Sequence, residues 1–124
     1  MSIGAQLFWV FIGGGVGSIA RLLLSKWANP SADGIPWGTF LANMIACTIL
    51  GLLIAMDEKS AIETRWKLGI ATGFCGGFST FSTFGLESLV MIRKDEWLTL
   101  LAYVIGSVTL GILCVYLGKK VGSL

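Results

Sequence analysis

The sequence contains no histidine, and charged residues make up only 13% of its 124 positions, whereas 55% are hydrophobic. A soluble domain carries roughly a quarter of its residues as charges, so this chain has too few for a water-facing surface. The lack of histidine removes the commonest general base and metal ligand. No nucleophile–base pair is visible, and a net charge of +2 is too small to indicate a nucleic-acid partner. The composition predicts a membrane protein that is not an enzyme.

The chain has a mean hydropathy of +0.82, and its apolar residues fall in blocks of the length that a bilayer requires, roughly 20 residues. Turn-forming residues at 29–36 separate the first two blocks. The first block is expected to be a retained helix, because no basic residue precedes Arg21 and the apolar run is too long for a signal peptide. We therefore predict one all-α transmembrane domain over residues 1–124, with four spans at about 4–24, 37–56, 66–92 and 97–118.

The basic residues are divided almost evenly between the two sides of the membrane. Four spans place both termini and the second loop on one side, with five basic residues: Lys59, Arg65, Lys67, Lys119 and Lys120. The other side holds Lys26, Arg93 and Lys94, with Arg21 near its boundary. This is a weak positive-inside bias. A chain whose loops do not favour one orientation can insert into the membrane in both orientations. Because four helices of this length hardly enclose a pathway alone, we expect a dimer.

Small residues lie at close-packing spacing within the first two spans. Gly13 and Gly17 are four apart, as are Cys47 and Gly51. Small residues let helix backbones approach, which drives association where lipid is as apolar as leucine.

The third span contains the segment Gly73-Phe74-Cys75-Gly76-Gly77-Phe78-Ser79-Thr80-Phe81-Ser82-Thr83-Phe84. Two adjacent glycines weaken a helix by about 1 kcal/mol each, and the hydroxyl residues that follow can cap a new helix. We predict a helix broken at Gly76-Gly77, followed by an aromatic face of Phe78, Phe81 and Phe84. The electropositive ring edges can hold an anion, although ordinary packing is the alternative. Ser79, Thr80, Ser82 and Thr83 form neighbouring hydroxyl rows.

Other polar residues lie within the apolar spans. Asn43, with Thr39 one turn before it, can donate to an anion or join helices. Glu87 can serve a pathway or pair with Arg21. Tyr103 and Ser107, with Gly111 on the same stripe, can extend a polar track or bond across helices.

These residues resemble the Fluc (CrcB-type) fluoride channels over essentially the whole chain. The twelve-residue segment matches the family signature, together with Gly17-x-x-x-Arg21 and Gly38-Thr39-x-x-x-Asn43. Two positions depart from the family pattern: Ala46 stands where Gly is usual, and Gly111 where Thr is common.

The resemblance implies an antiparallel, dual-topology homodimer in the bacterial inner membrane, in which two pores pass fluoride down its gradient. It makes Phe81 and Phe84 pore residues, Asn43 the polar-track amide, Tyr103 and Ser107 its continuation, and Glu87 an acidic pore residue. Thr39, Ser82, Thr83 and Arg21 are further pore candidates.

The resemblance also implies a structural Na⁺ at the dimer centre, held by the backbone carbonyls of Gly76 and Ser79. Physical chemistry agrees, because a broken helix frees carbonyls, and the negative end of a half-helix favours a cation.

Two alternatives differ in class. A small multidrug-resistance-type proton-coupled transporter also has four spans, but it relies on a carboxylate in the first span, which this chain lacks. A non-transporting assembly subunit would not require the interior hydroxyl rows.

Overall fold

The computed structural model describes residues 1–29 and 33–124, and all regular structure within these ranges is helical. The expected turn residues 30–32 lie outside the described residues. The long helices are α1 (Ile3–Ala28), α2 (Trp37–Glu58) and α6 (Trp97–Gly122). Between α2 and α6 the chain forms α3 (Thr64–Lys67), the π-helical segment η1 (Leu68–Cys75), α4 (Gly76–Phe78) and α5 (Phe81–Arg93).

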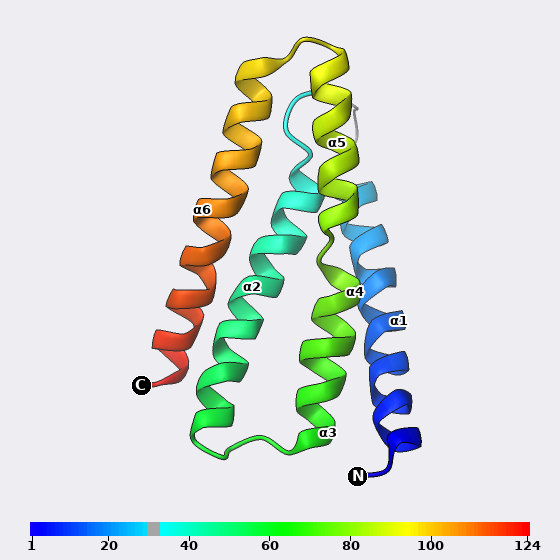
Figure 1. The fold of residues 1–124 in the computed structure, drawn as a ribbon, viewed down its shortest axis with the longest axis vertical. Helices are drawn as coiled ribbons and strands as arrows, with labels where there is room; N and C mark the ends of the chain where they lie inside the picture. The colour runs from blue at the N-terminus through cyan, green and yellow to red at the C-terminus, as the bar shows by residue number, and fades with distance from the viewer. Residues whose placement is uncertain (30–32) are drawn as a thin grey trace.

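The helices run alternately up and down (Figure 1). Helix α1 rises, α2 descends, the stacked segments from α3 to α5 rise, and α6 descends. Both termini and the loop between α2 and α3 lie at the same end, as the sequence predicted. Helix α1 packs mainly along η1 and α4, and α6 packs along α2.

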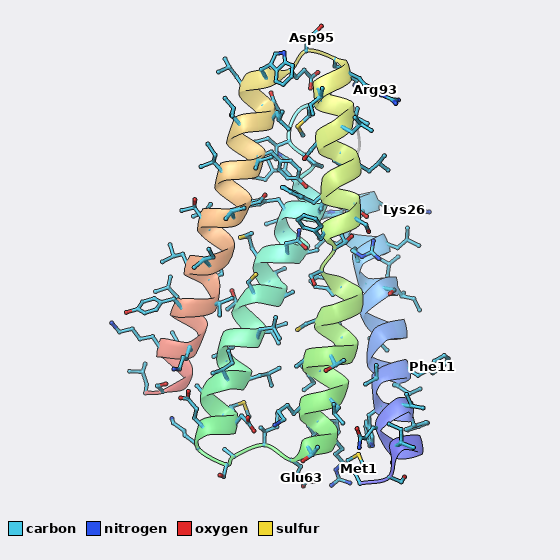
Figure 2. All side chains as sticks on the ribbon, viewed as in Figure 1. Met1, Phe11, Lys26, Glu63, Arg93 and Asp95 are labelled. Carbon is cyan, nitrogen blue, oxygen red and sulfur yellow. The ribbon has the colours of Figure 1, made fainter. Side chains whose placement is uncertain are left out.

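The surface of this bundle is apolar. Helices α1, α2 and α6 are each long and apolar enough to cross a membrane. Large apolar side chains project outward along them, including Phe11, which is 77% exposed (Figure 2). Of the labelled charged residues, Arg93 and Asp95 lie at one end and Glu63 at the other, while Lys26 lies near the upper end of α1, below Arg93. A protein with this distribution is a multi-pass membrane protein.

The predicted close packing of the first span is confirmed at Gly17. A side-chain carbon there would overlap the carbonyl oxygen of Phe74 in η1, so only glycine permits this approach. Gly51 likewise lies against the carbonyl oxygen of Val115, between α2 and α6.

The third expected span is interrupted, but the prediction of a break at Gly76-Gly77 is wrong. Gly76 has helical dihedral angles (φ −63°, ψ −37°), and the chain becomes extended at Ser79 (φ −81°, ψ 159°) and Thr80 (φ −155°, ψ 125°). Gly77 lies inside α4, against the backbone of α1 at Gly14. Gly77 therefore permits helix contact, whereas a side-chain carbon at Gly76 would meet nothing within 4 Å. The hydroxyl residues after the two glycines accommodate the break.

Candidate functional site

The break between α4 and α5 is joined to α2 through Asn43. The Thr80 amide donates to Asn43 Oδ1 at 2.8 Å, and Asn43 Nδ2 donates to the Thr80 carbonyl at 3.3 Å. Thr80 also caps α5, since its Oγ1 accepts from the Thr83 amide at 3.1 Å. Asn43 therefore joins helices, and its second Nδ2 proton is left for another acceptor.

The same bonds redirect the amides that would continue the helix. The Thr80 amide would normally donate to the Gly76 carbonyl, and the Thr83 amide to the Ser79 carbonyl, four residues earlier. Both amides instead donate to side chains, Thr80 to Asn43 and Thr83 to Thr80. The carbonyl oxygens of Gly76 and Ser79 thus lose their helical partners at the break.

Arg21 of α1 approaches the same region. Its Nε donates to the Gly77 carbonyl at 3.0 Å, near the carboxyl end of α4. A cation there complements the partial negative charge of a helix C-terminus. Arg21 is thus bound to backbone rather than to Glu87, with which the sequence left a pairing open.

Glu87 is held by two hydroxyl groups from neighbouring helices. Thr39 Oγ1 of α2 donates to Glu87 Oε2 at 3.0 Å, and the Tyr103 hydroxyl of α6 donates to Glu87 Oε1 at 2.9 Å. Thr39 and Tyr103 are almost fully buried, at 2% and 1% exposure. The three predicted residues thus form one hydrogen-bonded group that joins α2, α5 and α6.

The three phenylalanines do not form a single aromatic face. Phe78 is buried in α4 and stacks on Phe74, with ring centroids 5.2 Å apart. Phe81 and Phe84 lie beyond the break, 5.7 Å apart, and Phe84 also contacts the Tyr103 ring at 5.0 Å. The break rotates Phe78 away from the other two, which a simple three-residue period cannot anticipate.

An open cavity of about 260 Å³ adjoins the break. Five of the predicted residues line it: Asn43, Ser79, Phe81, Phe84 and Ser107. Within the described part of the chain, the buried Ser107 hydroxyl has no hydrogen-bond partner. Asn43 and Ser107 therefore offer uncommitted donors to an occupant of the cavity.

Other predicted residues lie outside this cavity wall. Ser82 Oγ is 3.4 Å from Thr80 Oγ1, and the Thr83 amide is used in the cap. Arg21, Thr39, Glu87 and Tyr103 act through the contacts described above. The hydroxyl rows thus serve mainly the cap and its surroundings.

The sequence prediction omitted Met44, Cys47 and Leu50 from the cavity wall. Cys47 is one turn beyond Asn43, and this helical spacing places the two on the same face of α2. Following the face of Thr39 and Asn43 by one further helical turn would have identified Cys47.

Comparisons with known proteins identify the family of this chain. The family model described as "CrcB-like protein, Camphor Resistance (CrcB)" matches residues 8–119. A protein of Phocaeicola vulgatus named "Fluoride-specific ion channel FluC" is 40% identical over 114 residues, covering 91% of this chain and 94% of its own. A protein of the same name from Ignicoccus hospitalis is 40% identical over 117 residues, covering 94% of each. "Fluoride-specific ion channel FluC 1" of Yersinia pseudotuberculosis is 42% identical over 122 residues, covering 94% of this chain and 96% of its own. The chain therefore belongs to the CrcB-like family, which confirms the resemblance seen in its sequence.

Proposed function

We propose that this chain is a fluoride-specific ion channel that releases fluoride passively across the inner membrane of a bacterium. The observation that carries the proposal is the cavity beside the helix break, where an amide, a hydroxyl and two phenyl rings converge. The names of the relatives support fluoride as the permeating ion.

The cavity offers groups that can replace the water around a small anion. The second Asn43 N–H and the Ser107 hydroxyl are donors, and the edges of Phe81 and Phe84 are electropositive. Phe81 is 84% exposed on this chain, so its ring is free to face an ion or a second subunit. The Thr39–Glu87–Tyr103 group fixes Tyr103 against Phe84 and thereby positions the second ring.

The active unit in this proposal is an antiparallel homodimer with two pores. Two features support it: the near-even distribution of basic residues between the two ends, and a cavity that is open on the single chain. A second subunit against this face would enclose the cavity from its open side.

A structural Na⁺ is part of the proposal. The carbonyl oxygens of Gly76 and Ser79, freed of helical partners, fit a hard monovalent cation, which prefers neutral oxygen ligands. The bound ion would supply fixed positive charge near the anion path. Among the described residues no three His, Cys, Asp or Glu side chains converge as a metal site.

The alternative is a proton-coupled transporter of the small multidrug-resistance type, which requires a carboxylate in its first span, and α1 of this chain has none. Fluoride release from proteoliposomes separates the two. A channel releases fluoride when a K⁺ ionophore balances the charge, without an imposed proton gradient. Release that required the proton gradient would favour the transporter.

A further inference from the structure

Three sulfur atoms gather between α2 and α6 beside the cavity. The Cys114 Sγ of α6 lies 3.8 Å from the Met44 Sδ of α2. A side-chain carbon at Gly111, one turn before Cys114, would lie 3.6 Å from both the Cys47 Sγ and the Met44 methyl carbon. Met44 and Cys47 are three residues apart and share a helix face. We call Met44, Cys47 and Cys114 the sulfur cluster.

Two members of the sulfur cluster face the cavity, and Cys114 lies behind them, in contact with Met44. Met44 and Cys47 line the cavity, next to Asn43 and Ser107. Cys47 and Cys114 are partly exposed free thiols. Cys75 differs, since it is 1% exposed and its thiol points to the Ala46 carbonyl at 3.8 Å. An ion that enters the cavity therefore reaches the cluster but not Cys75.

Thiolate and thioether ligands select soft cations such as Cu⁺, whereas Mg²⁺ and Ca²⁺ prefer oxygen. Structural zinc sites require four ligands, and the cluster has only three sulfurs. We propose that Met44, Cys47 and Cys114 bind a monovalent thiophilic cation, Cu⁺ or Ag⁺, and that the bound ion closes the cavity. Each metal–thiolate bond replaces an S–H bond and releases its proton to water, so no electron is transferred.

Closure follows from the position of the site. A bound cation would occupy the wall of a cavity of about 260 Å³ that also contains Asn43 and Ser107. This effect on flux rests on the proposed function, whereas binding of the metal does not.

Silver nitrate in chloride-free buffer is the probe, because chloride would precipitate silver. Purified protein is exposed to low-micromolar Ag⁺ and desalted, and the retained silver is measured by elemental mass spectrometry. The wild-type chain is expected to retain a single silver ion, and the double variant Cys47→Ser/Cys114→Ser none. Cys75→Ser is the matched control and is expected to retain silver like the wild type. Equal retention by the double variant would overturn the site.

Fluoride efflux from proteoliposomes tests whether silver closes the cavity. The rate of each variant with silver is compared with its own rate without silver. Silver should slow wild-type efflux, and excess dithiothreitol should restore it. Loss of one thiol should raise the silver concentration for half-inhibition by about tenfold or more. Even residues that only hydrogen-bond to a metal ligand change metal affinity by about 10- to 100-fold when they are replaced. Silver retained by the cluster without loss of efflux would overturn closure. If no efflux occurred before silver was added, the proposed function would fail, while silver retention would still decide the binding site.

Discussion

Asn43 and Thr80 exchange two hydrogen bonds at the break between α4 and α5, at 2.8 Å and 3.3 Å. The pair fixes the extended backbone at Ser79–Thr80 against α2 while leaving one Asn43 proton for the cavity. One side chain thus stabilises the break and faces the proposed ion path.

Asn43→Asp should lower fluoride flux sharply. The carboxylate keeps an oxygen for the Thr80 amide but loses both N–H donors. The Thr80 carbonyl then loses its hydrogen-bond donor, at a cost of about 1–3 kcal/mol. An ionised carboxylate at position 43 also repels fluoride. Flux in proteoliposomes should fall by about tenfold or more, in line with that cost. Asn43→Ser should be milder, because a hydroxyl still donates.

Thr48→Val is the matched control for Asn43, since Thr48 bonds only within α2, to the Met44 carbonyl. Equal tolerance of Asn43→Asp and Asn43→Ser would mean that Asn43 only joins helices.

Phe81→Ile and Phe84→Ile should each preserve assembly and lower flux. Isoleucine remains apolar but lacks the ring quadrupole that holds an anion at its edge. Efflux should fall by about two- to tenfold for each ring, which corresponds to the roughly 0.5–1.5 kcal/mol that ring geometry contributes in an aromatic contact. Phe11→Ile on the outer face of α1 is the control, and gel filtration checks assembly. Normal flux in both variants would assign these rings to ordinary packing.

Gly17→Ala should destabilise the protein, whereas Gly15→Ala should not. A methyl group at Gly17 overlaps the Phe74 carbonyl oxygen, but one at Gly15 meets nothing within 4 Å. Overpacking costs about 1–3 kcal/mol, occasionally more, and here the overlapping atom is backbone, which yields least. Thermal unfolding in detergent measures the difference. Similar melting temperatures for the two variants would contradict the packing of α1 on η1.

Exhaustive removal of Na⁺ should weaken the dimer and reduce flux. Without a cation, the carbonyls of Gly76 and Ser79 remain unpaired in a low-dielectric site, which is costly. Gel filtration and efflux are compared in Na⁺ and in a larger organic cation, and readdition of Na⁺ should restore both. An unchanged dimer and an unchanged fluoride flux after removal of Na⁺ would contradict a structural role for the ion.

The sequence predicted the features that depend on periodicity and residue size. The apolar blocks predicted the long helices, and the spacing of Gly13 and Gly17 predicted that α1 packs closely against a neighbouring helix. The position of the break was mispredicted, because low helix propensity at Gly77 is overridden by packing against α1. Thr80, which can cap a helix, is where the backbone actually leaves it.

The polar contacts between helices could not be predicted from the sequence. The sequence left Glu87 either in a pathway or paired with Arg21, and only the arrangement of α2, α5 and α6 selects Thr39 and Tyr103 as its partners. Arg21 likewise binds the Gly77 carbonyl, an acceptor that any residue could provide and that no motif reveals. Such pairings depend on helix rotation, which hydropathy does not determine.

Passive efflux of fluoride, compared with passive efflux of chloride, tests most directly whether the chain is a fluoride-specific channel. Purified protein is reconstituted into liposomes loaded with potassium fluoride or potassium chloride, and a K⁺ ionophore is added while an ion-selective electrode follows release. The account predicts rapid release of fluoride and retention of chloride, with protein-free liposomes retaining both. Retention of fluoride, or release of chloride at a comparable rate, would contradict a fluoride-specific channel.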